Sequence, residues 1–180
     1  MQFPKYLLVL ILVAGLVSCQ KTDVDRDVQL RVYMTDPNLV ASSLSVEIQG
    51  VKVKYKGTVE DSASNNIGHS DGWVWLDTKA GVYDLLELTS GKKALLAIGS
   101  IPGGQVKELR LVLGNNNSFS EGGKSIPVKI PAGSELGFKI PIVKQLAPPR
   151  DSLTIHFDAY YSIAKTSSES YTLVPSLQIK

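Results

Sequence analysis

Apolar and polar residues alternate along most of the chain from Val28 onward, with a period of two. Val28, Leu30, Val32 and Met34 form the first such series, and a turn at residues 36–38 (Asp-Pro-Asn) follows it. Successive side chains of a β-strand point to opposite faces, so this pattern predicts strands with one buried face. The predicted strands cover residues 28–34, 44–55, 73–76, 82–88, 94–98, 106–113, 126–130, 136–143, 152–160 and 171–179.

A few places depart from simple alternation. The apolar side chains move from even to odd positions at Gly50, which predicts a β-bulge there. Residues 57–72 are rich in Ser, Asn and Asp and are expected to form a polar loop. Residues 83–88 could form one helical turn instead of a strand, and residues 115–117, three asparagines, are expected to form a turn.

Many short strands between turn signals favour an all-β sandwich of about 8–10 strands. No repeat or compositional break is visible after residue 27, so residues 28–180 are expected to form a single β-sandwich domain. Such a length, in a chain that is 43% hydrophobic and 20% charged, suffices for folding without disulfides. The formal net charge of +2 gives no reason to expect a nucleic acid partner.

Residues 1–18 have the pattern of a signal peptide. Lys5 precedes an apolar run over residues 6–17, which is shorter than the roughly 20 residues of a transmembrane helix. Leu16-Val17-Ser18-Cys19 then resembles the lipobox of bacterial lipoproteins. Cys19 is the single cysteine of the chain, and its thiolate would carry the lipid, with fatty acids such as palmitate holding the protein on a membrane. The alternative is a plain signal peptide with a chance cysteine near the cleavage point.

Residues 19–27 are polar and are expected to form a solvated tether between the lipid and the first strand. Gln20 follows the cysteine, whereas an Asp there tends to retain lipoproteins at the inner membrane. The segment also resembles the export signal of Bacteroidetes surface lipoproteins, although Thr22 stands where an acidic residue is typical. We therefore expect a lipid anchor in the cell outer membrane, with the cell surface favoured over the periplasmic face.

Several motifs occur in a fixed order along the predicted strands. They are Tyr-Asp-Leu-Leu-Glu-Leu at 83–88, Gly91 with Ala-Leu-Leu at 94–96, Ile-Pro-Gly-Gly at 101–104 with Leu-Arg-Leu-Val-Leu at 109–113, Phe-Asp-Ala at 157–159 and Leu-Val-Pro-Ser-Leu at 173–177. Over residues 28–180 this order resembles the prokaryotic family known as domain of unknown function 4382. The resemblance implies an exported protein or lipoprotein with an Ig-like or transthyretin-like β-sandwich. It brings no catalytic residues with it.

Catalytic and metal-binding patterns are weak. His156 and Asp158 leave the same face of a predicted strand, where alternation alone explains a polar outer face. His69 lies in the predicted polar loop and is expected to be solvated. The alternating acids of the tether lack the glycine and glutamate of an EF-hand loop, and the two histidines are too far apart in sequence to suggest zinc. We expect no catalytic residue, no metal and no cofactor.

Trp73 and Trp75 alternate with Val74 and Leu76, so the two indoles lie on one face of a strand. If the aliphatic pair faces the core, the tryptophans form an exposed platform suited to a glycan or a protein partner. Large aromatic side chains are usually buried, which favours the opposite arrangement, with both tryptophans in the core or under the long loop.

These observations leave three functions open. The first is a non-enzymatic binding or interaction module that uses Trp73 and Trp75. The second is an adhesin-like or fimbria-like subunit that assembles by adding a strand at a sheet edge. The third and weakest is a hydrolase, which would require His156 or His69 in a pocket beside a nucleophile and a carboxylate.

Overall fold

The computed structural model describes residues 27–38, 43–61, 66–167 and 170–180, so the predicted signal peptide, Cys19 and the tether up to residue 26 lie outside the described residues. The described chain is almost entirely β-structure, which confirms the all-β prediction. Its two helices are single 3₁₀ turns, η1 (Leu85–Leu88) and η2 (Tyr160–Ser162). No helix within these ranges is long and apolar enough to span a membrane.

The described residues form thirteen strands, more than the eight to ten expected, because several short strands flank the long ones. The strands are β1 (Val28–Thr35), β2 (Leu44–Asp61), β3 (Asn66–Thr78), β4 (Gly81–Asp84), β5 (Ala94–Ile101), β6 (Gly104–Leu113), β7 (Ser118–Glu121), β8 (Lys124–Lys129), β9 (Phe138–Gln145), β10 (Arg150–Asp158), β11 (Ile163–Ser167), β12 (Ser170–Leu173) and β13 (Ser176–Ile179).

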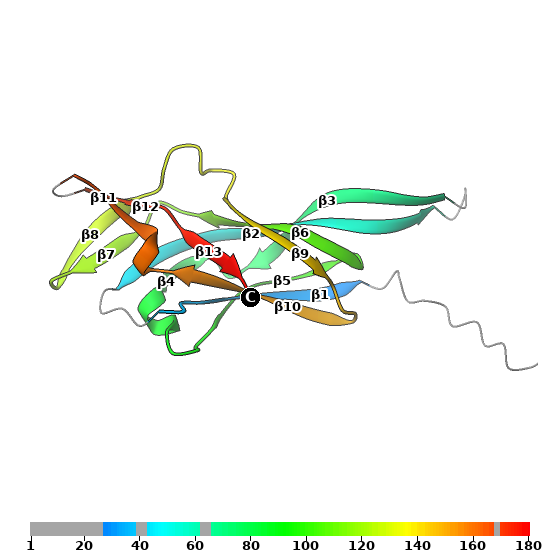
Figure 1. Ribbon diagram of the computed structural model, residues 1–180, viewed down its shortest axis with the longest axis horizontal. Coiled ribbons are helices and arrows are strands. Elements are labelled where there is room, and N and C mark those ends of the chain that lie inside the picture. Colours follow the sequence, from blue (N-terminus) through cyan, green and yellow to red (C-terminus); the bar gives the residue numbers. More distant parts are fainter. Residues whose placement is uncertain (1–26, 39–42, 62–65, 168–169) are drawn as a thin grey trace, which may run out of the picture.

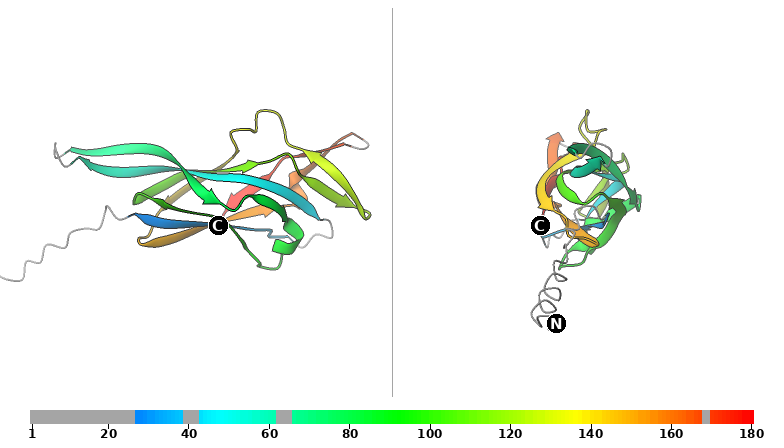
Figure 2. Two further views of the ribbon diagram at one scale, coloured as in Figure 1. Left: turned by 180° about the vertical axis from the view of Figure 1, so that it is seen from behind. Right: turned by 90° about the vertical axis from the view of Figure 1, so that its right-hand side faces the viewer.

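All of these strands belong to one curled sheet that folds over itself into a sandwich (Figures 1 and 2). One layer contains β5, β1, β10 and β13, and the other contains β2, β6 and β9. Strand β3 joins the layers, since it pairs with β2 along most of its length and with β5 at Asp77 and Thr78. Strands β7, β8, β12 and β11 extend the sheet at one end of the molecule.

The core lies between the two layers and is filled by the alternating side chains that the sequence predicts. Val32 of β1 is fully buried and lies opposite Leu153 of β10, in a parallel pair. Ile155 and Phe157 continue the buried series of β10, and Ala159, directly after the strand, is also buried. The predicted inner and outer faces of these strands are therefore confirmed.

Gly50 marks an irregularity in the long strand β2. The register between β2 and β6 shifts between Ile48 and Gly50. Ile48 before the shift and Val51 after it are both fully buried. The extra residue in the bulge moves the core-facing positions of β2 from even to odd residue numbers. The predicted bulge is confirmed.

The prediction of a polar loop over residues 57–72 is wrong for residues 57–61 and 66–72, and residues 62–65 lie outside the described residues. Strands β2 and β3 form an antiparallel hairpin whose paired positions continue to Asp61 opposite Asn66. Strand β6 accompanies β2 only as far as Gly57, and the hairpin then projects as a two-stranded arm (Figure 1). A ladder is held by backbone hydrogen bonds, so a polar sequence can form it where no second layer has to be covered.

The strand predicted over residues 82–88 ends at Asp84, so the alternative of a helical turn is correct for residues 85–88. Residues 83–88 enter a strand and then form the helical turn η1, which Asp84 caps by accepting a hydrogen bond from the backbone N–H of Leu86. Residues 115–117 form the predicted turn between β6 and β7. Asn117 is buried in that turn, where its side chain accepts a hydrogen bond from the Glu47 backbone N–H and donates one to the Gly114 carbonyl.

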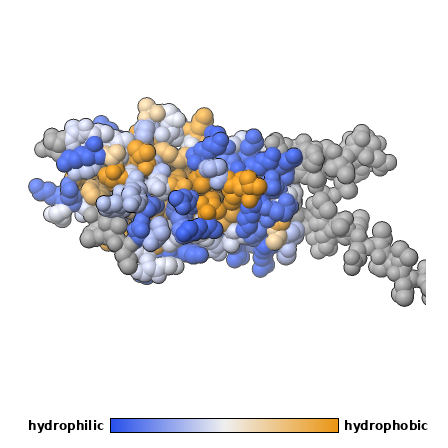
Figure 3. All heavy atoms as spheres, viewed as in Figure 1, coloured by the Kyte–Doolittle hydropathy of each residue, from blue (hydrophilic) through white to orange (hydrophobic). Residues whose placement is uncertain are grey.

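The sandwich is open along one side. In the described chain β9 pairs only with β6, and β13 pairs only with β10. The two strands approach each other without a ladder between them. Figure 3 shows an apolar area over β9 on this face, and Val143 of β9 is 80% exposed.

Candidate functional site

Strand β3 places the two tryptophans on the outer surface of the sandwich. Trp73 lies opposite Lys54 of β2, and Trp75 lies opposite Lys52. Leu76, on the other face of β3, is buried in the core. Trp73 is 41% exposed and Trp75 is 61% exposed, so the expectation of buried tryptophans is wrong. The strand has only two faces, and Val74 and Leu76, which alternate with the indoles, occupy the inner one.

Cationic side chains hold the indoles in a row. The Lys52 Nζ lies 5.3 Å from the ring centroid of Trp73 and 4.9 Å from that of Trp75. Arg110 comes from β6, on the other side of β2, and its Cζ lies 4.8 Å from the Trp73 ring centroid. Each distance is within the range of a cation–π contact. We call the surface formed by Trp73, Trp75, Lys52 and Arg110 the indole face.

The carboxylate of Glu108 fixes the position of the Arg110 guanidinium beside Trp73. Arg110 Nε donates a hydrogen bond of 2.7 Å to Glu108 Oε1, and Lys139 Nζ of β9 lies 3.3 Å from Glu108 Oε2. Burial acts to raise the pKa of Glu108, but the hydrogen bonds and charges of Arg110 and Lys139 outweigh it and lower that pKa. Glu108 is therefore an anion at neutral pH and orients Arg110 beside Trp73.

Gly50 provides the space for the Trp75 ring. A Cβ atom at Gly50 would lie 2.7 Å from Cζ3 of the Trp75 indole, which is closer than such atoms approach in proteins. The bulge residue thus has a second consequence, because its missing side chain lets the indole lie against the backbone of β2.

The remaining cations of this surface give it an excess of positive charge. Lys54 lies in register with Trp73 on one side and with Glu108 on the other. Lys139 is exposed on the neighbouring strand. Arg110, Lys139 and Lys54 neighbour one buried carboxylate, Glu108. Lys52 lies in register with Arg110, and Asp77 is exposed further along β3. An anionic group that reached the indoles would meet these cations.

His156 has a different environment from that of a catalytic histidine. It lines a small cavity of about 70 Å³ with Asp158, Ser176 and Gln178, so a carboxylate and a hydroxyl are present. However, the Nδ1 of His156 is buried without a hydrogen-bond partner in the described chain, whereas a catalytic relay needs that atom oriented by a carboxylate. Burial, followed by the charges of Lys180 and Lys93, lowers the pKa of His156.

The other residues singled out in the sequence are His69 and Cys19. His69 is in β3, opposite Thr58, and not in a loop. Within the described ranges no group of three or more His, Cys, Asp or Glu side chains is arranged to hold a metal ion. Cys19, the predicted lipidation site, lies outside the described residues.

Sequence reasoning missed one pocket, at the end of the molecule formed by β7, β8, β11 and β12. It has a volume of about 470 Å³, and its lining includes Phe119 and Tyr171. Neither β7 nor β11 is among the predicted strands. Their sequences, Ser-Phe-Ser-Glu and Ile-Ala-Lys-Thr-Ser, are too short and too polar to stand out, and Phe119 alternating with serines is the only signal.

Comparisons with known proteins identify a family and give no activity. Neither a curated protein nor a solved structure matches the chain. The family model described as "Domain of unknown function (DUF4382)" matches residues 27–175, which include nearly all of the sandwich. The chain therefore belongs to the DUF4382 family.

Proposed function

We propose that the protein is a lipid-anchored, non-catalytic binding module that takes an acidic glycan on its indole face. The observation that carries the proposal is the pair of exposed indoles, Trp73 and Trp75, held in a row by Lys52 and Arg110. The lipobox ending at Cys19 supports the anchor, and the tether that follows supports display on the outer surface of the outer membrane.

The fixed position of the indoles favours binding. Ordering a flexible side chain on association costs about 0.5–1.5 kcal/mol. Lys52 contacts both rings, and Glu108 orients Arg110 against Trp73. The surface is therefore largely arranged before a ligand arrives, and the exposed part of each indole can stack on the C–H face of a sugar ring.

The charges around the indoles favour an acidic glycan over a neutral one. Lys52, Lys54, Arg110 and Lys139 outnumber the carboxylates among their neighbours, Glu108 and Asp77. A carboxylate on the glycan would pair with these cations while the sugar ring covers an indole. Interactions of this kind between exposed charges weaken with salt, because the Debye length is only about 8 Å at physiological ionic strength.

Calorimetric titration with polygalacturonate, and with neutral dextran for comparison, tests the proposal. The protein should bind polygalacturonate, more weakly at high salt, and should not bind dextran through this face. Trp73→Ala combined with Trp75→Ala should abolish binding without unfolding the protein, because neither indole belongs to the core. Tyr161→Ala, which removes another exposed ring, is the control. Unchanged binding by the double variant would contradict the proposal, and binding of a protein partner instead would identify a different ligand class.

The open side of the sandwich supports a second candidate, assembly by strand addition. Within the described residues, the outer edge of the last strand, β13, has no pairing strand, and neither has the facing edge of β9. A strand from another molecule could pair with both edges and cover the apolar area there. Proline substitution of Val143 should then prevent formation of multimers, whereas a natural protein that stays monomeric at high concentration would exclude this candidate.

A further inference from the structure

The pocket at the β7–β12 end of the molecule is separate from the indole face and has its own chemistry. It is formed by the first residue of β2, Leu44, together with side chains of β7, β11, β12 and η2. Its volume of about 470 Å³ lies within the range of roughly 300–1,000 Å³ that is typical of small-molecule sites. We refer to it as the end pocket.

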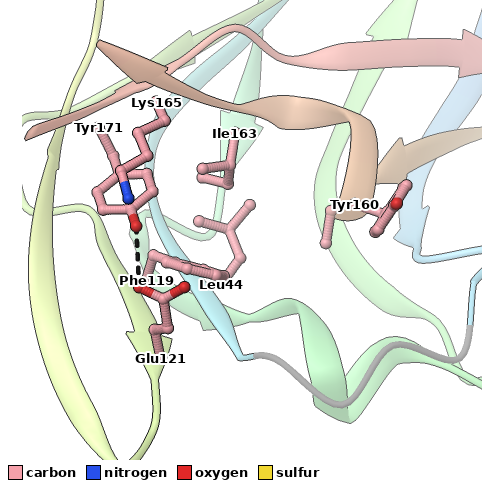
Figure 4. Close-up of a pocket in the computed structure, with 8 residues that line it drawn as sticks. Leu44, Phe119, Glu121, Tyr160, Ile163, Lys165 and Tyr171 are labelled. Atoms are coloured by element: carbon pink, nitrogen blue, oxygen red, sulfur yellow. Dashed lines mark hydrogen bonds between the residues drawn. The ribbon is translucent and has the colours of Figure 1, made fainter. Parts of the chain in front are cut away.

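Aromatic and aliphatic side chains form the walls of the end pocket. The rings of Phe119 and Tyr171 lie side by side, with centroids 5.6 Å apart and planes inclined at 48°. Figure 4 shows Tyr160 on the opposite side, with Leu44 and Ile163 between. Tyr160 is largely exposed, whereas Leu44 is buried in the core. A ligand would thus meet an apolar floor and, on one side, the aromatic rings of Phe119 and Tyr171.

Two oppositely charged side chains stand at the same wall. The hydroxyl of Tyr171 donates a hydrogen bond of 2.8 Å to Glu121 Oε2. Lys165 Nζ lies 5.6 Å from the centroid of the Tyr171 ring. Tyr171 is buried apart from 7% of its surface, so its fixed hydroxyl holds the Glu121 carboxylate in place. The other carboxylate oxygen, Oε1, can then accept a hydrogen bond from a ligand.

Glu121 and Lys165 beside the aromatic wall favour one class of ligand. An anion would meet the Glu121 carboxylate and a cation would meet the Lys165 ammonium, so the balanced pair favours a neutral molecule. A purely apolar ligand would remove water from both charged groups without replacing its hydrogen bonds, which is unfavourable. A neutral molecule with hydroxyl groups on its edge and an apolar face satisfies both the charges and the rings.

We propose that the end pocket binds the pyranose ring of a neutral sugar. One face of the ring lies against Phe119 and the aliphatic floor. A sugar hydroxyl donates to Glu121, and another accepts from Lys165. This site does not depend on the indole face, which lies on β3 and is proposed to take an acidic ligand.

Saturation-transfer NMR with D-glucose, D-galactose and D-mannose tests the proposal, with D-glucuronate and D-glucosamine as charged comparisons. At least one neutral sugar should receive saturation at its ring C–H groups, and the charged sugars should bind less well. Glu121→Gln should weaken binding about tenfold, because a hydrogen bond to a charged acceptor is stronger than one to a neutral amide. Glu87→Gln, on the exposed side of η1, is the matched control and should bind normally.

A second pair of variants separates this proposal from the proposed function. Phe119→Ala should abolish sugar binding, whereas Trp73→Ala with Trp75→Ala should leave it unchanged. Thermal unfolding checks that each variant is folded; if Phe119→Ala unfolds, Glu121→Gln decides, since Glu121 is exposed. The proposal is overturned if no neutral sugar binds the natural protein, if a charged sugar binds better, or if Glu121→Gln binds as well as the natural protein.

Discussion

At the scale of single residues, one glycine controls the position of an indole. Gly50→Ala would place a methyl group where the Trp75 ring now lies. We expect this variant to stay folded but to displace Trp75, which should change the near-ultraviolet circular dichroism and weaken binding of polygalacturonate. Gly81→Ala is the matched control, because a Cβ at Gly81 meets nothing within 4 Å. Identical spectra and affinity for Gly50→Ala and the natural protein would show that Trp75 is not held against β2.

His156 gives a residue-scale prediction for pH dependence. Burial and the charges of Lys180 and Lys93 lower its pKa in the folded protein, whereas in the unfolded chain the pKa is about 6.5. Protonation therefore favours the unfolded state, and the free energy of unfolding should fall as the pH drops below about 6.5.

Denaturant unfolding between about pH 8 and pH 5 measures this effect. In His156→Gln, which cannot titrate, the fall over this window should be smaller than in the natural protein. Carboxylate titrations shared by the two proteins cancel in the comparison. An equal pH dependence of both would mean that His156 is not buried in the way described.

The position of the two tryptophans could be predicted from the sequence only in part. Alternation in residues 73–76 placed the two tryptophans on one face, but it could not decide which face was buried. Tryptophans are usually buried, which favours the core for both indoles. In the structure Leu76 is buried instead, so the indoles lie on the outer face. Lys52 and Arg110 come from two other strands, so their contacts with the indoles depend on the register of β2 and β6, which the sequence does not give.

Among the elements, the turn between β6 and β7 is joined to β2 by hydrogen bonds, and Asn117 supplies the buried side chain among them. Asn117 is buried and makes hydrogen bonds with the backbone of Glu47 and of Gly114. Asn117→Ala would leave buried backbone groups without partners, which costs about 1–3 kcal/mol. Urea unfolding should show this loss, whereas Asn116→Ala, an exposed neighbour, should have little effect. Equal stability of the two variants would contradict the role given to Asn117.

Strands with a buried face were predictable, and strands without one were not. The bulge at Gly50, the alternation of β1 and β10, and the helical turn after Asp84 all follow from local patterns that the structure confirms. The arm formed by β2 and β3 and the short strands β7 and β11 were missed. Their residues are mostly polar, and the backbone pairing that makes them strands leaves no mark on the sequence of side chains.

For the molecule as a whole, we propose that a lipid anchor holds the sandwich on a membrane, where the indole face meets its ligand. The predicted anchor consists of one sulfur, that of Cys19, carrying fatty acids. Cys19→Ser should therefore leave the precursor uncleaved and release the protein from washed membranes, as detected by immunoblotting of membrane and soluble fractions. A substituted protein that is still processed and membrane-bound would contradict the anchor.

Intrinsic fluorescence reports on binding of an acidic glycan at the indole face. The chain contains two tryptophans, Trp73 and Trp75, so all indole emission comes from this surface. Titration with polygalacturonate should shift the emission to shorter wavelengths and protect it from quenching by acrylamide, while dextran should do neither. Emission and quenching that stay unchanged at saturating polygalacturonate would show that the indole face does not bind it.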